Sequence, residues 1–579
     1  MSTSLTPAAT SGTARQPSAI DRIADQYVER MAALDPIGAT VSGINGHDTE
    51  MTDYSPAGEA ARDELNGQTL AALAQAAPAD ETDRVTVAAM NERLGLEREL
   101  YAAGEPFRKL NNIECPLQYS RDVFDQMPTA TVQDWEQIAE RLGHVPEAID
   151  SYRASLRLGQ ERGLMPAARQ AAIGAAQAQE LARPGSFFDA FAAGAPASVA
   201  AATPGTAFPD SLSARLSGAA AQARAAYGRL ADFLSRDLLP HAPTSDAVGR
   251  ERYELASREF LGARIDLDET YEWGLAELAH VDREERAVAA QIAGPGATKA
   301  QAVEILNRDP AYQLHGTDAL QRWMQETADQ AIDFLDGTHF DFTDQMRRLD
   351  CRIAPTQNGG IYYTGPNEDF TRPGTMWWSV PPGVTEFNTW FERTTVYHEG
   401  VPGHHMQMAT AIQDPDLNRW RKVGVWVSGH GEGWALYAER LMDDLGFLAT
   451  PGDRLGMLDS QKLRCARVVF DIGVHLAKPC PEAWGGGTWD ADKGWNLLRR
   501  TVAMEDSFLK FEFERYLGWP GQAPSYRIGQ RIWEELRDEA KARAASAGRP
   551  FSLKDFHTRA LRLGSVGLDV LRAALRGTL

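Results

Sequence analysis

The sequence predicts a mainly α-helical protein, a large two-lobed body of many helices with a central cleft and one small β element. Between residues 20 and 350, Ala, Leu, Glu, Arg and Gln dominate, and apolar residues recur at i, i+3, i+4 and i+7, as in 20–34 and 132–158. Helical periodicity returns from residue 385 onward. Residues 359–382 instead carry aromatic runs between Gly and Pro, which is typical of a hairpin or small sheet, and they are the only convincing strand candidate.

The predicted organisation of the 579 residues is one continuous fold with three parts. Residues 1–19 are expected to be a disordered tail, residues 20–350 an N-terminal helical region, and residues 351–579 a C-terminal helical region with the candidate site. No repeat of fixed period indicates a solenoid. Helices are expected to break where Pro and Gly cluster, at 185–209, 239–243 and 294–296.

Composition excludes several classes of protein. Hydrophobic residues make up 43% of the chain and its formal net charge is −21, without a dense Lys/Arg run, so we expect a substantial core and no nucleic-acid partner. The first twenty residues contain no apolar run of the kind a signal peptide needs, and no later stretch of about 18 apolar residues could span a membrane. The four cysteines are too few and scattered for a disulfide framework. We therefore expect a cytoplasmic protein without a membrane partner; nothing in the sequence specifies an oligomeric state.

A cluster of histidines marks the candidate site. Five of the twelve histidines lie between residues 398 and 475, and the centre of the cluster is YHEGVPGHH at 397–405, followed by Glu432 in a Gly-Glu-Gly-Trp segment. Two His and one Glu form a zinc ligand set that leaves a position for water, and a Glu beside the first His is placed to deprotonate that water. We predict one Zn²⁺ per chain, held by His398, His404 and Glu432, with Glu399 as the general base.

The spacing of these histidines requires a bent helix. In the familiar H-E-x-x-H pattern both His share one helix face, but here position i+4 is Pro402. On a regular helix His404 would lie about 240° around from His398, and His405 about 10.5 Å along the axis. Pro402 and Gly403 favour a deformation, because Pro cannot donate to the helix ladder and Gly tolerates unusual torsions. Our preferred interpretation returns His404 to His398, with His405 as the alternative ligand.

Other residues near this motif have two interpretations each. Glu432 fits a ligand, or a carboxylate stabilised by the N-terminus of its helix. Glu439, seven residues further on the same face, fits a hydrogen bond to a ligand histidine, or an ion pair with Arg440 or with a base from another helix. His405 and His430 are candidates for substrate contact or for support of the ligands.

The aromatic segment before the motif could cover the metal. Residues 367–378 are expected as an edge strand or loop over the site, with Tyr362, Tyr363 and Arg372 facing substrate. An aromatic-packed hairpin with no role in binding is the equal alternative.

Two later segments could complete the site. Arg467, Asp471 and His475 recur every four residues on one helix face, which suits a salt-bridged structural face or a stripe facing substrate. Tyr526 lies between Gln522 and Arg527 at a helix start, where its hydroxyl could donate to the oxyanion formed on a carbonyl carbon. A buried capping aromatic is the alternative for Tyr526.

Four motifs together carry a family resemblance. YHEGVPGHHMQ, GHGEGWALYAERLM, RVVFDIGVHL and WPGQAPSYRIGQ, in this order, resemble the bacterial domain of unknown function 885 family from about residue 20 to the end of the chain. More distantly, the H-E-x-x-P-G-H-H core and the downstream E-G-W are similar to helical glutamate-zinc peptidases of the thimet oligopeptidase and thermostable carboxypeptidase type. This chain departs from those peptidases by two extra residues between His398 and His404.

These observations predict a zinc metallohydrolase, most concretely a peptidase that acts on short peptides. Glu399 would take a proton from water and return it to the leaving amine. Three alternatives remain: hydrolysis of a small non-peptide amide, an iron-dependent reaction on the same scaffold, and an inactive binding protein. The iron alternative arises because two His and one carboxylate also suit non-haem iron. Glu399 favours hydrolysis, because neither an oxygenase nor an inactive protein needs a base beside the first ligand.

Overall fold

The computed structural model describes residues 15–354 and 360–579. It is 67% helix and 4% strand. This confirms the predicted mainly helical class with a small β element. The α-helices up to residue 335 are α1 (Ala19–Leu34), α2 (Pro36–Val41), α3 (Pro56–Gln75), α4 (Glu81–Ala102), α5 (Pro116–Asp122), α6 (Val132–Glu161), α7 (Ala168–Ala182), α8 (Phe187–Ala202), α9 (Asp210–Asp232), α10 (Arg250–Leu261), α11 (Leu267–Ala293), α12 (Lys299–Leu306) and α13 (Thr317–Leu335).

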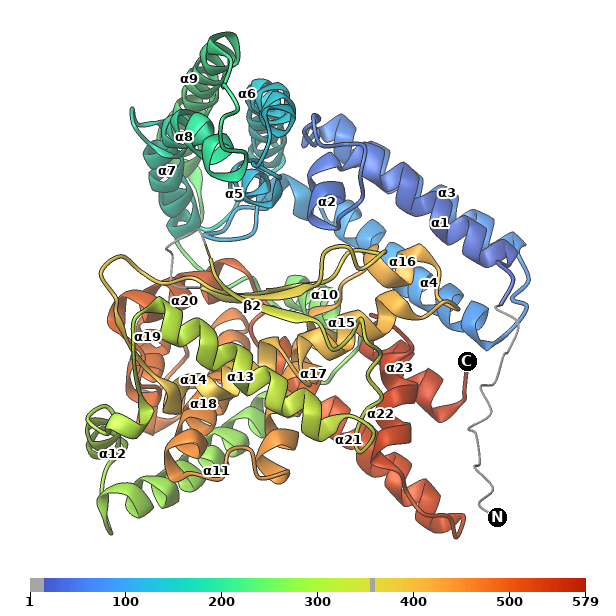
Figure 1. Cartoon of the computed structure of the whole chain (residues 1–579), viewed down its shortest axis with the longest axis vertical. Coiled ribbons are helices and arrows are strands. Elements are labelled where there is room, and N and C mark those ends of the chain that lie inside the picture. Colours follow the sequence, from blue (N-terminus) through green and yellow to red (C-terminus); the bar gives the residue numbers. More distant parts are fainter. Residues whose placement is uncertain (1–14, 355–359) are drawn as a thin grey trace.

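The later helices alternate with short loops around the candidate site (Figure 1). Among the described residues, no helix combines the length and the apolarity needed to cross a membrane. These helices are α14 (Thr389–Glu399), α15 (His404–Gln413), α16 (Arg419–Val423), α17 (Ser428–Asp444), α18 (Pro451–His475), α19 (Ala491–Thr501), α20 (Asp506–Gly518), α21 (Ser525–Ser546), α22 (Leu553–Leu561) and α23 (Leu568–Arg576).

The start of the chain is held by charge and by a helix cap. Of the expected disordered tail, residues 1–14 lie outside the described residues. Arg15 pairs with Asp80 at 2.6 Å and with Asp21 at 2.5 Å. Ser18 caps α1 by accepting the backbone N–H of Asp21 at 3.0 Å. Residues 15–19, expected as part of a disordered tail, are therefore held in place by these contacts.

The buried apolar residues fall into two clusters. One is built mainly by α5 to α9, with Trp135 and Tyr227 at its centre, and this group stands at the top of Figure 1. The other joins α1, α3 and α4 to α10–α23 and includes Trp434 and Trp533. The N-terminal helices thus share a core with the C-terminal region, and the expected boundary near residue 350 falls inside that core. The two-lobed body with a central cleft stays a prediction.

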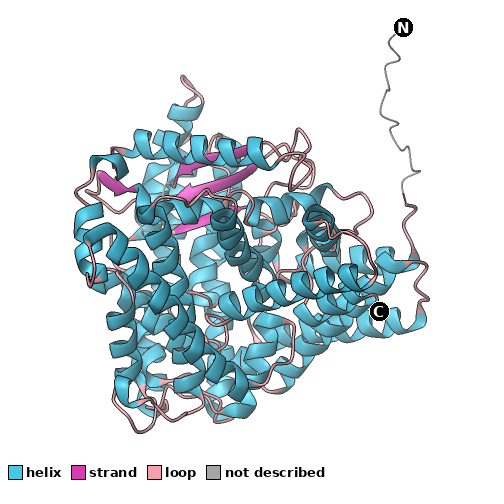
Figure 2. Cartoon of the chain, turned by 90° about the horizontal axis from the view of Figure 1, so that it is seen from below, coloured by secondary structure: helices cyan, strands magenta, loops and turns pink. Residues whose placement is uncertain are grey.

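The β structure is more extensive than the sequence indicated. The predicted hairpin is confirmed as β3 (Ile361–Thr364) antiparallel to β4 (Gly374–Trp378). The strands β2 (Leu349–Ile353), parallel to β4, and β1 (Gln313–His315), antiparallel to β5 (Glu386–Asn388), were not predicted. Runs of three to five residues are too short for alternation to be read. Figure 2 shows the strands as a small group among helices.

One predicted break is wrong. Residues 185–209 were expected to interrupt the helices, but α8 fills most of this segment and contains Pro196. Its alanines have high helix propensity, and Phe188, Ala192, Ala195 and Val199 bury one face of it, which offsets the cost of the internal proline. The other two breaks are confirmed, since they separate α9 from α10 and α11 from α12.

The helices around the candidate site are held by close backbone contact. β5 runs directly into α14, α14 packs on α17 and α18, and α17 packs on α21. At the crossing of α17 and α21, a Cβ added at Gly529 would lie 2.0 Å from the carbonyl oxygen of Gly429. Only glycine fits there, and the crossing fixes the position of the first turn of α21 relative to α17.

Candidate metal centre

The HEGVPGHH motif forms a sharp bend between two helices. α14 ends at Glu399 and α15 begins at His404, with a cis Val401–Pro402 peptide between them. A Cβ added at Gly403 would lie 1.8 Å from the carbonyl oxygen of His398, so the chain can pass this close only with glycine. The predicted deformation is thus a complete interruption of the helix.

Trp434 fixes this bend from the neighbouring helix. Its indole Nε1–H donates to the carbonyl oxygens of Pro402, at 2.9 Å, and Gly403, at 3.1 Å. Because Trp434 is fully buried in α17, the bend is tied to the helix that also carries Glu432.

The bend brings three candidate ligands together. His398 Nε2 lies 3.3 Å from Glu432 Oε2, and His404 Nε2 lies 3.5 Å from the same oxygen. The three ligand atoms all lie within 4.8 Å of one another, and both imidazoles are buried. Their spacing is compatible with bonds of about 2 Å to one shared Zn²⁺ after small side-chain adjustment.

The surroundings of His398 fit a metal ligand. Glu439 makes the predicted contact, because its Oε1 lies 2.8 Å from His398 Nδ1 while its Oε2 accepts from Thr394 Oγ1 at 2.6 Å. Such a carboxylate fixes the imidazole with Nε2 facing the metal. Burial opposes a charge on His398, but its hydrogen bonds to Glu432 and Glu439 outweigh burial and raise its pKa to about 10. The site therefore attracts positive charge, as a cation site requires.

Glu399 and Tyr526 flank this triad. Glu399 makes no hydrogen bond or ion pair to a described residue, and burial raises its pKa, although His398 and His404 act in the opposite direction. The Tyr526 ring stacks on His398 with a centroid distance of 6.5 Å and an interplanar angle of 15°. Burial and then the charge of Glu432 raise the pKa of Tyr526, which keeps its phenol protonated at neutral pH.

His405 does not face the triad. Its Nε2–H donates to the Met346 carbonyl oxygen at 2.6 Å, and its Nδ1 accepts from the Tyr363 hydroxyl at 2.8 Å. Both ring nitrogens are thereby used, and burial lowers the pKa of His405 to about 4. Tyr363, expected over the metal, instead supports His405.

Two further candidates lie away from the ligands. His430 Nδ1 accepts from Gln407 Nε2 at 2.9 Å, and its ring packs against Trp533. Burial lowers the pKa of His430 to about 3, so it is neutral. Arg372 donates to the carbonyl oxygen of Gly365 at 3.4 Å and makes no hydrogen bond or ion pair to His398, His404 or Glu432.

The stripe on α18 has the structural role that was one of its two interpretations. Arg467 Nε donates to the Tyr516 hydroxyl at 2.6 Å, and its Nη2 donates to Glu512 at 2.7 Å. Asp471 accepts from the Gly521 N–H at 2.9 Å, and His475 Nε2 donates to the Tyr516 carbonyl oxygen at 3.0 Å. The stripe holds α20 and the loop that precedes α21.

Arg467 also reaches the candidate site. Its guanidinium carbon lies 4.8 Å from the centroid of the Tyr526 ring, close enough for a cation–π contact. Arg467 therefore supports Tyr526 from the side of α18.

Sequence reasoning missed three neighbours of the site. Thr394, which holds Glu439, lies four residues before His398, so the helical period could have indicated it. Trp426, whose ring centroid lies 5.7 Å from that of His404, and Arg464, whose charge lowers the pKa of Glu399, carry no such local signal.

Comparison with known proteins supports the fold. The family model described as "Bacterial protein of unknown function (DUF885)" matches residues 36–575. No curated protein matches the chain. Its fold is shared by a crystal structure from Colwellia psychrerythraea, provisionally described as a lipoprotein, with 21% identity, a TM-score of 0.82, and coverage of 96% of this chain and 98% of that one. A lipoprotein of unknown function from Shewanella oneidensis, also provisional, is similar at 16% identity and a TM-score of 0.68, with the same coverage.

Proposed function

The chain belongs to the DUF885 family, whose function is unknown. From the geometry of the site, we propose that it is a zinc-dependent hydrolase that cleaves amide bonds of short peptides. The observation that carries this proposal is the convergence of His398 Nε2, His404 Nε2 and Glu432 Oε2 within 4.8 Å, with Glu399 directly after the first ligand. When bound, Zn²⁺ supplies a Lewis acid that polarises a carbonyl group and lowers the pKa of water.

Glu399 is the proposed general base. Its carboxylate has no hydrogen-bonding partner among the described residues and is therefore free to accept a proton from the attacking water. The same carboxyl then returns the proton to the leaving amine. Burial, which raises its pKa, favours this transient protonation.

Tyr526 is the proposed donor to the developing oxyanion. Its ring lies against His398, and its raised pKa keeps a proton on the phenol oxygen. A donor aimed at the place where negative charge develops stabilises the transition state more than the substrate. Hydrolysis of a small non-peptide amide would use the same groups, so a substrate panel has to separate the two.

A paired substitution tests the metal site. We expect about one zinc per purified chain by elemental analysis. His404→Ala should lose this zinc, whereas His405→Ala should keep it, because His405 donates to Met346 and faces away. Retention of zinc by both variants, or a metal-free wild type that binds no added zinc, would reject the site. Turnover of a short-peptide library by the zinc-loaded protein, abolished in His404→Ala, tests the reaction.

We also propose that the protein works in a reducing compartment, the cytoplasm. All four cysteines are unpaired and buried, which supports this placement. Cell fractionation with an antibody to the chain tests it, and recovery of the protein with the envelope would reject it.

A further inference from the structure

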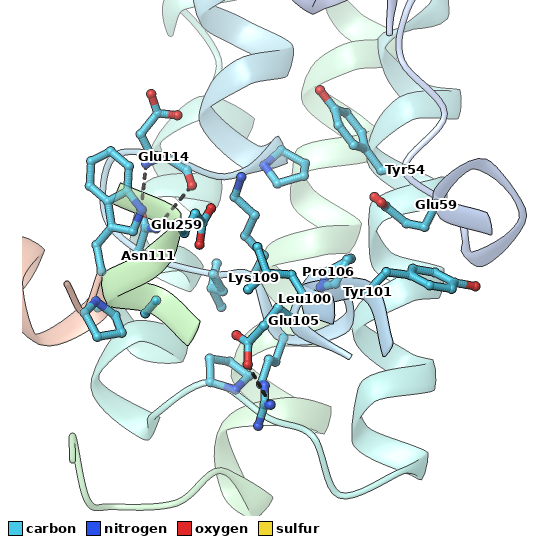
Figure 3. Close-up of a pocket in the computed structure, with 18 of the residues that line it drawn as sticks. Tyr54, Glu59, Leu100, Tyr101, Glu105, Pro106, Lys109, Asn111, Glu114 and Glu259 are labelled. Carbon is cyan, nitrogen blue, oxygen red and sulfur yellow. Dashed lines mark hydrogen bonds and ion pairs between the residues drawn. The ribbon is translucent and has the colours of Figure 1, made fainter. Parts of the chain in front are cut away.

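A cavity of about 760 Å³ lies outside the candidate metal centre and shares none of its ligands. Its walls include residues of α1, α3, α4 and α10 and of the segments 105–116 and 517–520. Figure 3 shows part of this lining. This volume is within the range of about 300–1,000 Å³ that is typical of ligand pockets.

The lining of the cavity is acidic. It contains eight Asp and Glu residues but four Lys and Arg residues. Arg98 and Arg169, outside the lining, pair with Asp63 and Asp246. Even with these two counted, the cavity keeps an excess of two negative charges. An anionic ligand is therefore disfavoured.

Four carboxylates of the lining, Asp35 and three glutamates, form no ion pair within the described residues. Glu97, Glu114 and Glu259 form no ion pair with any residue in the described ranges 15–354 and 360–579, whereas Glu59 and Glu105 are paired with arginines. Burial raises the pKa of Glu97 and of Glu259, although the charge of Arg93 near both and of Lys109 near Glu259 acts in the opposite direction. Carboxylates held in such a place without a partner are costly, and a cation between them would lower that cost.

A buried amide points to the same ligand chemistry. Gln170 lines the cavity, is 1% exposed, and donates through Nε2 to the Glu514 carbonyl oxygen at 2.9 Å. Its Oε1 has no hydrogen-bond donor among the described residues. This oxygen is covered by the wall, so an amine in the cavity would supply the missing donor only after the amide turns toward it.

Aromatic rings and one lysine complete the lining. Figure 3 shows Tyr54 and Tyr101 on one side and Glu114 and Glu259 on the other, with Lys109 between them. Lys109 donates from Nζ to the Tyr119 hydroxyl at 3.1 Å, and its charge lowers the pKa of Glu259, so it offsets part of the acidic charge of the lining. Such tyrosine rings suit the apolar stem of a basic side chain or a cation–π contact.

Two residues of the cavity wall are followed, a few positions later in the sequence, by rings that contact the candidate ligands. Gly424 lines the cavity, and two residues later the Trp426 ring packs against His404. Pro520 also lines it, and six residues later the Tyr526 ring packs against His398. These short connections place the cavity near enough to the triad for one substrate to be considered at both.

We propose that this cavity is the subsite for the positively charged part of a peptide substrate, so that the protein acts on short cationic peptides. This inference rests on the proposed function. The cation is an N-terminal ammonium or a Lys or Arg side chain, and both present the same charge and N–H donors to Glu97, Glu114 and Glu259.

Binding of three matched peptides, measured by calorimetry, tests the subsite without any turnover. The probes are penta-alanine with a free N-terminus, the same peptide N-acetylated, and the N-acetylated peptide with one Lys, each offered to metal-stripped protein and to the zinc-loaded Glu399→Gln variant, neither of which should cleave it. We expect the acetylated alanine peptide to bind roughly 10-fold more weakly than at least one charged peptide, and the stronger charged peptide identifies the source of the cation. Equal affinity for all three peptides would overturn the proposal.

Isosteric variants locate the binding. Glu97→Gln and Glu259→Gln should each lower the affinity for the charged peptide roughly 3- to 10-fold at low salt, because each removes one partly screened negative charge. Glu64→Gln is the matched control. Glu64 is exposed and lies on α3, another helix of the cavity wall, and this variant should bind the charged peptide as the wild type does. Unchanged affinity in both cavity variants, with normal melting temperature, contradicts the subsite.

The outcomes separate this inference from the proposed function. Charge-dependent binding without cleavage of any peptide would keep the subsite and reject the peptidase. Zinc-dependent cleavage without preference for charge would keep the peptidase and reject the subsite.

Discussion

The carboxylate of Glu439 offers a quantitative test of the metal site. It is 1% exposed and accepts from His398 Nδ1 at 2.8 Å and from Thr394 Oγ1 at 2.6 Å. Loss of such a partner of a ligand histidine typically costs about 10- to 100-fold in metal affinity. In Glu439→Gln the single amide oxygen can still accept from His398, so we expect a loss of about 10-fold. In Glu439→Ala nothing orients the imidazole, so we expect a loss of about 100-fold, or about 2.7 kcal/mol.

The assay is a zinc titration of metal-stripped protein against a competing chelator, with melting temperature recorded in parallel. Asp459→Asn is the matched control, because Asp459 is another buried carboxylate, accepts from Lys299 at 2.6 Å, and lies on α18 away from the ligands. Asp459→Asn should lower the melting temperature without lowering the affinity for zinc. Wild-type zinc affinity in both Glu439 variants, or an equal loss in Asp459→Asn, would refute the reasoning.

Four other predictions follow from the same contacts. Glu399→Gln should keep its zinc but lower kcat by about 10²-fold or more, because the amide cannot accept the proton; normal kcat in steady-state assays would reject the base. Tyr526→Phe should lower kcat and kcat/KM together by about 10- to 10³-fold with KM little changed, whereas a lower melting temperature with normal kcat would assign it a purely structural role. Gly529→Ala should cost about 1–3 kcal/mol in the free energy of unfolding, because its Cβ would meet the Gly429 carbonyl oxygen at 2.0 Å; unchanged urea denaturation would show that α21 can shift. Burial lowers the pKa of His557 to about 3, so as pH falls the imidazole is protonated in the unfolded chain before it is protonated in the folded one. The free energy of unfolding should therefore decrease below about pH 6.5, by up to about 1.4 kcal/mol per pH unit. Urea midpoints between pH 5 and 7 should vary less in His557→Asn than in the wild type, and equal slopes would contradict this.

The bend and the triad could be predicted because their signals are local. Pro402 and Gly403 lie between the histidines, and a helix cannot continue through them, so only a return of the chain could bring His404 to His398. Glu439 was accessible to the same reasoning, since seven residues are close to two helical turns from Glu432. The choice between His404 and His405 could not be made locally, because it depends on the Met346 carbonyl oxygen, which lies 59 residues away.

The role of the α18 stripe and the cavity depend on contacts between distant segments. A period of four shows that Arg467, Asp471 and His475 share a face, but not that α20 packs on that face. The cavity draws Glu97, Glu114 and Glu259 from separate parts of the chain, and each alone is an ordinary glutamate in the sequence. Their lack of cationic partners becomes visible only when all neighbours are placed.

Two independent backbone features set the geometry of the site. The bend at Gly403 places His404 beside His398, and Trp434 ties this bend to α17, which carries Glu432. The glycine crossing of α17 and α21 places Tyr526 against His398. Since α17 takes part in both features, a shift of this helix moves the carboxylate ligand relative to the histidines and the phenol relative to the ligands. Such a site is preorganised by its framework, and its geometry depends on glycines and a tryptophan that never touch a substrate.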